Sequence, residues 1–380
     1  HGYDTAAFAD MPYVGPLTKL DRGFRTMSNL QANEVQPFSK LVKATGRLHR
    51  VLSRRYCKTG QTPVVLGEAM HWLTRERDPR KPFLLYIHSD ETHAPFLPPG
   101  RYRKSFTDLS VSQMHATNKD KQKYVAGLET MTNKERQDLW NLALAEVAYF
   151  DEWLGRLFDL LRRQGLYDDT VIVITADHGE NMSEHGLLRH AMCLYDTLLH
   201  VPLIVKPPGK GGPQKRVPEM VQLIDLLPTL MRMANINEPE AEAEFQGRDL
   251  LARVAQHDFP PFVVSELYPP ANAAMWEKKV PHFADTFREK HDRTLRSIRT
   301  HTHKYIWASR GPHELYDHIA DPGEEQSLID IEPLQASQLR EQLERFLNVD
   351  ASTPPEPSAS TPTETDDQVL QRLRDLGYIA

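Results

Sequence analysis

An unbroken run of mostly β-branched apolar residues at 171–175 is followed at once by the polar residues Asp177 and His178. A second apolar run, at 201–205, comes after a polar loop. Runs without polar alternation are typical of strands covered on both faces, as in a parallel sheet. Because ligands bind outside the carboxyl ends of such strands, the pattern predicts an active site directly after residue 175.

The same pattern recurs earlier in the chain, where the apolar residues 83–87 precede a polar stretch that contains His93. Between the two strands, apolar residues at helical spacing predict a helix of about 25 residues that begins near Trp140 and ends near Gly165. A second helix is expected over residues 62–77, where Thr62-Pro63 suits a cap followed by a proline in the first turn. Alternating strands and helices predict an α/β sandwich with a mostly parallel central sheet flanked by helices.

Three other segments have distinctive patterns. Residues 37–58 combine basic and apolar side chains as in an amphipathic helix, and residues 223–233 suit a short helix broken at Pro228. Residues 100–135 are polar and are expected to form a partly helical insertion over the site.

The pattern changes after about residue 253, where short apolar runs separated by turns predict a smaller antiparallel sheet followed by a helix at 333–347. The strands are expected at 262–268, 295–300, 304–308 and 314–317. The predicted organisation is an α/β domain over 1–253, a C-terminal α+β subdomain over 254–350, a Pro/Ser/Thr linker over 351–366 and a terminal helix over 367–380.

Composition narrows the classes of function. The 380 residues are 40% hydrophobic and 26% charged with a net charge of -6, which is ordinary for a globular protein and gives no sign of nucleic-acid binding. No apolar stretch approaches the roughly 18 residues of a membrane span. Two cysteines, Cys57 and Cys193, exclude a disulfide framework and a thiolate zinc site. Neither compartment nor oligomeric state follows from the sequence.

Asp177 and His178 are the first candidates for chemistry. A carboxylate oxygen and an imidazole nitrogen at a strand end suit half the coordination shell of a divalent cation. The alternative interpretation is a turn in which Asp177 only caps the next segment.

Histidines and an arginine in the following loop suit contact with an anionic substrate, and here His190, His185 and Arg189 are rivals. Each also fits a surface loop residue without a role. His93 has its backbone restricted by Pro95 and could donate a proton to a leaving oxygen. Cys193 is better read as a small packed side chain than as a nucleophile.

Short motifs are spread along the chain. In order they are Gly2-Tyr3-Asp4-Thr5-Ala6, residues 91–99, residues 166–170, Asp177-His178-Gly179-Glu180, residues 199–205, residues 225–230, Gly247-Arg248-Asp249-Leu250, residues 303–306, residues 314–317, Asp321-Pro322-Gly323-Glu324 and Leu376-Gly377-Tyr378. Taken together in this order, they resemble the sulfatase family of the alkaline phosphatase superfamily, in particular its microbial members. The resemblance implies an alkaline-phosphatase-like sandwich and a sulfuric ester hydrolase that acts on a sulfated small molecule or glycan.

The resemblance also implies the parts of the site. One divalent cation, Ca²⁺ first and Mg²⁺ or Mn²⁺ as alternatives, would be bound by Asp177 and His178. His190 would contact the sulfate, with Arg189 and His185 as further substrate contacts, and His93 would protonate the leaving alcohol. The family's nucleophile is a formylglycine made from the cysteine of a Cys-x-Pro-x-Arg motif.

The chain departs from the family in one respect. Neither Cys57 nor Cys193 lies in a Cys-x-Pro-x-Arg motif, and no early pair of aspartates is present. In the family both precede the Gly-Tyr-x-Thr-Ala segment, which here is residues 2–6. We therefore expect that an N-terminal portion with the nucleophile is missing and that the fragment alone is inactive. Two alternatives stay open, a phosphonate monoester or phosphodiester hydrolase of the same superfamily and a non-catalytic sulfatase-like binding protein.

Overall fold

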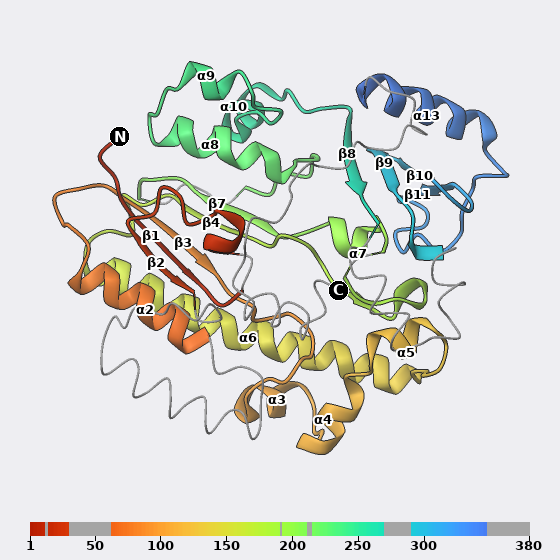
Figure 1. Cartoon of the computed structure of the whole chain (residues 1–380), viewed down its shortest axis with the longest axis horizontal. Helices are drawn as coiled ribbons and strands as arrows, with labels where there is room; N and C mark the ends of the chain where they lie inside the picture. Colours follow the sequence, from red (N-terminus) through yellow and green to blue (C-terminus); the bar gives the residue numbers. More distant parts are fainter. Residues whose placement is uncertain (12–13, 30–61, 191, 211–214, 270–289, 348–380) are drawn as a thin grey trace. The chain divides into compact units, whose positions relative to one another are not determined.

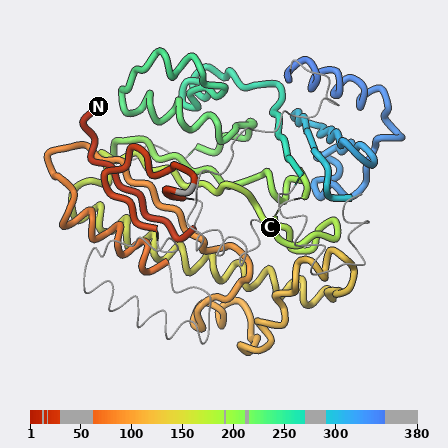
Figure 2. Tube along the Cα trace, in the orientation of Figure 1, coloured from red at the N-terminus to blue at the C-terminus, as the bar shows by residue number. Residues whose placement is uncertain are grey.

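The computed structural model forms two compact units, the first over His1–Tyr167 and the second beginning at Asp168 (Figure 1). Figure 2 traces the chain through both units. The structure describes residues 1–11, 14–29, 62–190, 192–210, 215–269 and 290–347.

The first unit contains a parallel three-stranded sheet in the order β2-β1-β3. Its strands are β1 (Asp4–Ala9), β2 (Thr26–Asn29) and β3 (Phe83–His88). A short 3-10 helix, η1 (Pro16–Thr18), lies between β1 and β2. Since all three strands are parallel, the residues that follow β1 and β3 meet at one edge of the sheet. The predicted strand at 83–87 is confirmed.

Two helices accompany this sheet, α2 (Thr62–Arg75) and α6 (Asn133–Arg163) (Figure 1). Helix α2 packs onto β1 and buries Trp72 and Leu66 completely. The helix predicted over residues 62–77 is therefore confirmed.

Helix α6 begins earlier than its apolar spacing predicts. Its start is fixed by a capping box in which Thr132 and Glu135 each satisfy the other's backbone N–H. The helix buries Leu142 and Tyr149, whereas Trp140 on the predicted apolar stripe is 44% exposed. The assignment of the buried face from the sequence was therefore wrong in this stretch.

The polar stretch before α6 is partly helical, as expected. It contains α3 (Gly100–Phe106), α4 (Val111–Thr117) and α5 (Lys121–Val125).

The second unit begins with an antiparallel pair, β4 (Ile172–Thr175) and β7 (Leu203–Lys206). Both strands were expected from their composition. The side chains of β4 are half-buried or exposed, so the expectation of a strand covered on both faces was wrong.

Between β4 and β7 lie short elements that shape the loop. They are β5 (Asn181–Met182), η2 (Glu184–Gly186), β6 (Leu188–Arg189) and α7 (Asp196–Leu199). Strands β5 and β6 form an antiparallel hairpin.

Four short helices follow β7. They are η3 (Leu223–Asp225), α8 (Leu226–Met233), α9 (Pro239–Glu242) and α10 (Leu250–Gln256). The segment 223–233 is a broken helix, as expected, but the division lies between Asp225 and Leu226, and Pro228 lies in the first turn of α8.

The chain then forms a four-stranded antiparallel sheet in the order β11-β10-β9-β8. The strands are β8 (Phe262–Leu267), β9 (Leu295–Thr300), β10 (His303–Ala308) and β11 (Glu314–Asp317), and helix α13 (Pro333–Leu347) follows them. One face of the sheet packs on α13 through a cluster that includes Ile298, Tyr305 and Leu339. This smaller antiparallel sheet and its helix are confirmed.

Some of the predicted segments are not among the residues that the structure describes. The helix at 37–58, the linker at 351–366 and the terminal helix at 367–380 lie outside the described residues. The boundaries proposed for the domains stay predictions. Among the described helices, none is both long enough and apolar enough to cross a membrane.

Candidate active site

Asp177 and His178 lie in the turn that follows β4, at the end of the strand. Their side chains are accessible, with 69% of Asp177 and 37% of His178 exposed. The imidazole Nδ1 of His178 lies 2.8 Å from the carbonyl oxygen of Gly179. Because a carbonyl only accepts, Nδ1 carries the proton, and in the neutral ring Nε2 presents its lone pair. Metal-binding histidines are commonly oriented by such a hydrogen bond from the other ring nitrogen.

These two side chains fit a divalent cation. Nε2 of His178 lies 3.9 Å from Oδ2 of Asp177. Ligand bonds of about 2.0–2.6 Å allow two donor atoms of one ion to lie roughly 4 Å apart. The carboxylate and the imidazole could therefore bind one ion together.

Gly179 holds this turn close to α7. Its N–H donates to the carbonyl of Leu198 at 2.8 Å, and a Cβ built on Gly179 would lie 2.1 Å from the carbonyl oxygen of Thr197. No other residue fits there without a shift of the backbone. The glycine of the Asp-His-Gly-Glu motif is therefore required by its close approach to α7.

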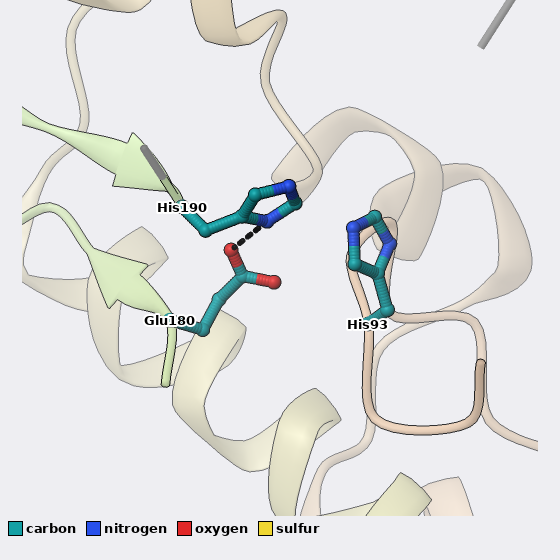
Figure 3. A group of neighbouring side chains, drawn as sticks. All are labelled: His93, Glu180 and His190. Carbon is teal, nitrogen blue, oxygen red and sulfur yellow. Dashed lines mark hydrogen bonds and ion pairs between the residues drawn. The ribbon is translucent and has the colours of Figure 1, made fainter. Parts of the chain in front are cut away.

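The β5–β6 hairpin brings His190 next to the turn. Asn181 pairs with Arg189 in the ladder, so Glu180 and His190 lie opposite each other just beyond it. Nδ1 of His190 lies 3.4 Å from Oε1 of Glu180 (Figure 3). The imidazole rings of His190 and His178 lie 4.3 Å apart. A group that can carry a positive charge thus lies beside the Asp177–His178 pair.

The other two loop candidates differ in their surroundings. The ring of His185 stacks on Tyr195 with centroids 3.7 Å apart, and its Nε2 is buried. Arg189 is half-buried and forms no ion pair with the residues that the structure describes. Both have positive φ angles, 54° for His185 and 65° for Arg189, which non-glycine residues rarely adopt. Such backbone conformations are concentrated at functional sites.

Asn181 is a residue that sequence reasoning missed. It is almost completely buried, its amide donates to the carbonyl of Arg189 at 2.8 Å, and its oxygen accepts from the Thr197 hydroxyl at 2.6 Å. It therefore joins both strands of the hairpin to α7. The sequence signal that could have identified Asn181 was its position directly after the Asp-His-Gly-Glu motif.

Cys193 lies near Asn181 and is buried. Burial raises the pKa of the Cys193 thiol to about 11, so little thiolate is present at neutral pH. The interpretation of Cys193 as a packed side chain is confirmed.

His93 belongs to the first unit and follows β3. Its Nδ1 lies 3.6 Å from Oδ1 of Asp90, and the side chain is 21% exposed. Thr92, just before it, has a φ of 73°. The N–H of Asp90 donates at 2.6 Å to Asp10, which follows β1. The carboxyl ends of β1 and β3 thus bring polar side chains together, as the parallel pairing requires.

Asp10 was not foreseen as a special residue. Its carboxyl group is buried, and this burial, together with the neighbouring charges of Asp90 and Glu91, raises its pKa well above the usual value. A buried acid among acids is electrostatically costly in its ionised form.

Residues 3–236, more than half of the chain, match the family described as sulfatase. The chain belongs to the sulfatase family. Residues 183–350 also match the family described as the C-terminal part of N-sulphoglucosamine sulphohydrolase. The family resemblance seen in the sequence is thereby confirmed, and the homologous sulfatases are hydrolases.

Curated relatives are distant in sequence. The uncharacterized sulfatase YidJ of Escherichia coli K12 is 26% identical over 262 residues, which cover 63% of this chain and 46% of the relative. Arylsulfatase K of Bos taurus is 25% identical over 406 residues, covering 99% and 70%. The arylsulfatase of Clostridium perfringens is 26% identical and covers 70% and 53%. The chain thus spans about half the length of the two bacterial relatives.

Solved structures establish the fold. A putative sulfatase from Bacteroides fragilis superposes with a TM-score of 0.55 at 21% identity, over 74% of this chain and 57% of that one. The phosphonate monoester hydrolase of Agrobacterium radiobacter gives 0.66 at 19% identity, over 91% and 78%. A protein solved with its substrate D-glucosamine-2-N,6-O-disulfate gives 0.63 at 18% identity, over 94% and 82%. The sulfatase is therefore an alkaline-phosphatase-like α/β protein, as expected.

Proposed function

We propose that this sulfatase hydrolyses sulfate esters with one divalent cation bound by Asp177 and His178. The observation that carries the proposal is the paired geometry of these two side chains inside the region that matches the sulfatase family. Calcium is the ion that the family resemblance implies, with magnesium and manganese as alternatives, and the Asp177 carboxylate is a ligand that suits all three. When bound, the cation would stabilise charge on the sulfate oxygens.

The neighbouring side chains have roles in this proposal. His190 would contact the sulfate, since its ring lies against that of the metal ligand His178. Arg189, whose side chain is half-buried and pairs with no described carboxylate, is the second candidate contact. His185 is the least suited of the three because its ring already stacks on Tyr195.

His93 would donate the proton to the leaving alcohol. Its place after β3 and its contact with the Asp90 carboxylate, which would help to orient the ring, support this role.

A formylglycine is the proposed nucleophile. Cys193 does not supply it, because its thiol is buried and hydrogen-bonded to Asn181 rather than placed in a Cys-x-Pro-x-Arg motif.

The substrate class is a sulfated small molecule or glycan. The structural relative that was solved with D-glucosamine-2-N,6-O-disulfate supports this choice at the level of the shared fold. The individual substrate is set by loops around the site rather than by the fold.

A phosphonate monoester hydrolase is the second candidate. It is supported at the level of the shared fold by the TM-scores of 0.66 and 0.64 to the enzymes of Agrobacterium radiobacter and Silicibacter pomeroyi, beside 0.63 to the protein solved with D-glucosamine-2-N,6-O-disulfate. Both candidates require the same metal pair, so only the choice of ester separates them.

The metal pair is tested by calorimetric titration of the protein, as its gene encodes it, with calcium, magnesium and manganese. We expect one ion per chain, with binding weakened at least tenfold by Asp177→Asn or His178→Ala, because each removes one of the proposed ligand atoms. Asp169→Asn is the matched control, since this exposed carboxylate lies just before the same strand. Unchanged affinity in Asp177→Asn would show that the metal assignment is wrong.

A further inference from the structure

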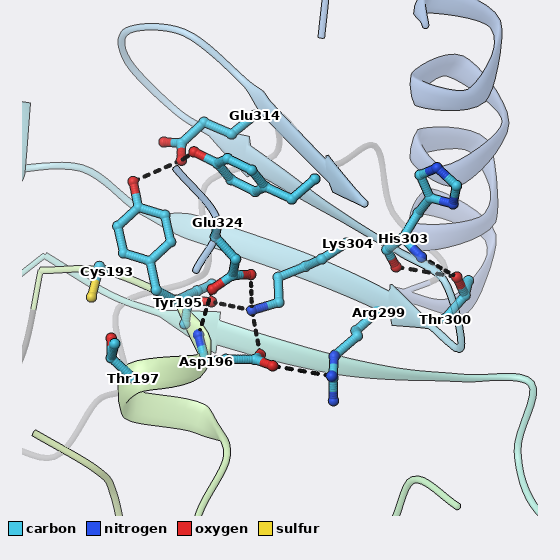
Figure 4. Close-up of polar contacts among 12 residues, drawn as sticks. Cys193, Tyr195, Asp196, Thr197, Arg299, Thr300, His303, Lys304, Glu314 and Glu324 are labelled. Atoms are coloured by element: carbon cyan, nitrogen blue, oxygen red, sulfur yellow. Dashed lines mark hydrogen bonds and ion pairs between the residues drawn. The ribbon is translucent and has the colours of Figure 1, made fainter. Parts of the chain in front are cut away.

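A lysine buried in the C-terminal sheet contacts the segment that packs on the turn carrying Asp177 and His178, called the metal turn below. Lys304 on β10 is 0% exposed. Its Nζ lies 2.6 Å from Oδ1 of Asp196, 2.5 Å from Oε1 of Glu324 and 3.2 Å from the carbonyl oxygen of Leu194 (Figure 4). The ammonium group donates hydrogen bonds to Asp196 and Leu194 and forms an ion pair with Glu324. The sequence offers no sign of this, because Lys304 and Asp196 are 108 residues apart.

The charges around Lys304 balance. Arg299 on β9 lies 3.0 Å from the second oxygen of Asp196, so two cations face the carboxylates of Asp196 and Glu324. Burial alone would raise the pKa of Asp196, but the charges of Lys304 and Arg299 outweigh it, and the pKa lies below its usual value. Asp196 is therefore ionised at neutral pH and forms ion pairs with Lys304 and Arg299.

Two of the acceptors belong to one short segment. Leu194 lies two residues before α7, and Asp196 is the first residue of that helix. The Glu324 carboxylate also accepts the backbone N–H of Asp196 at 2.7 Å. Side chains of Leu194 and Leu199 pack on Leu295 and Ile306 of the sheet. The start of α7 is thus held to the C-terminal sheet by charge, hydrogen bonds and apolar contact.

The other side of α7 supports the metal turn. The carbonyl of Leu198 accepts from Gly179, and the hydroxyl of Thr197 donates to Asn181. Gly179 and Asn181 flank Glu180 and immediately follow the Asp177–His178 pair. A continuous path of contacts therefore leads from Lys304 through α7 to the proposed ligands.

We infer that Lys304 is a positioning residue for the metal pair, acting through Asp196 and α7. The inference rests on the proposed function, because it assumes that Asp177 and His178 bind the cation. Without the Lys304 ammonium group, the start of α7 would lose its central ionic contact. The turn that α7 supports would then adopt a wider range of positions.

The alternation along β10 provides a matched control. Lys304 and Ile306 lie on the α7 side of the sheet, whereas Tyr305 and Trp307 lie on the α13 side together with Ile298 of β9. Ile298→Ala would remove buried core contacts from the same sheet without touching α7. This variant therefore reproduces a loss of sheet stability but keeps the contact between the sheet and α7.

The experiment uses the protein as its gene encodes it. It measures calcium affinity by titration calorimetry well below the unfolding temperature, and the rise of Tm caused by calcium. The parent chain, Lys304→Met, Ile298→Ala and Asp177→Asn are compared. We expect Lys304→Met to weaken calcium binding about tenfold, as changes behind a metal ligand do, and Ile298→Ala to lower Tm while the affinity stays within about twofold of the parent.

The outcomes separate the inference from the function on which it rests. A parent chain that binds no calcium would overturn the metal pair and the inference with it. Strong binding by the parent together with equal binding by Lys304→Met would overturn the inference alone, as would equal weakening by Ile298→Ala. If Lys304→Met does not fold, the calcium affinity of Asp196→Asn tests the inference instead. We expect this variant to bind calcium about threefold more weakly than the parent, and equal binding would overturn the inference.

Discussion

His178 shows how the backbone could orient a single residue for the metal binding that we propose. The carbonyl of Gly179 fixes the proton on Nδ1, so Nε2 faces the Asp177 carboxylate with its lone pair. A histidine without such a partner would exchange between two tautomers, only one of which can bind an ion in this direction.

Asp10 gives a prediction at the same scale. Its pKa is raised in the folded state, so ionisation of this carboxyl destabilises the fold as pH rises from its unfolded pKa towards its folded one. Asp10→Asn keeps an oxygen that can accept from the Asp90 N–H but removes the charge. We expect the variant to be more stable than the parent at pH 8 by about 1 kcal/mol, and to lose most of this advantage near pH 4.

Thermal unfolding at several pH values checks this expectation. A gain of about 2–4 °C in Tm at pH 8 corresponds to that free energy for a unit of this size. The exposed Asp169 supplies the control, since Asp169→Asn should leave the pH dependence unchanged. A variant that is less stable than the parent at pH 8 would contradict the electrostatic cost assigned to Asp10.

At the scale of elements, the site depends on contacts among very short pieces. The β5–β6 hairpin has strands of two residues each, and α7 has four. Their positions come from Asn181 and Gly179, which contact α7 directly, rather than from propensity along the sequence.

Gly179→Ala tests that dependence. The added methyl group would lie 2.1 Å from the carbonyl oxygen of Thr197, so either the turn or α7 must move. Overpacking of this kind costs about 1–3 kcal/mol, and we expect a lower Tm together with weaker calcium binding.

The control lies in α6, where Gly155 has no atom within 4 Å of a built Cβ. Gly155→Ala should raise stability by about 0.5–1 kcal/mol, because alanine is the better helix former. If Gly179→Ala retained the stability and calcium affinity of the parent, the close packing of the turn on α7 would not matter for the site.

The longer elements follow from local pattern, and the shorter ones do not. Strand β3 and helix α13 were predicted because their apolar residues have clear spacing and length. Strand β2 (Thr26–Asn29) has only one large apolar residue and becomes a strand through its pairing with β1. Helix α6 begins with a polar turn, so its capping box at Thr132, rather than apolar spacing, marks its start.

The candidate site divides in the same way. Asp177 and His178 could be found because they follow an apolar strand directly. The placement of Glu180 opposite His190 depends on a hairpin too short to leave a pattern, and Lys304 reaches Asp196 across 108 residues of sequence. Local sequence therefore identifies reactive residue types, whereas tertiary contacts decide which of them meet.

At the scale of the whole molecule, the sulfatase match covers residues 3–236 and the C-terminal match covers 183–350. The two overlap in the loop that carries Arg189, His190 and α7. This overlap includes α7, whose first residue Asp196 contacts Lys304 of the C-terminal sheet.

Side-by-side hydrolysis of an aryl sulfate and an aryl phosphonate monoester, by the protein as its gene encodes it, tests the central claim most directly. We predict release of sulfate with a kcat/KM that exceeds that for the phosphonate, is lost on metal chelation and falls at least a hundredfold in Asp177→Asn but not in Asp169→Asn. A preference for the phosphonate, or sulfate release that persists in Asp177→Asn, would contradict the account.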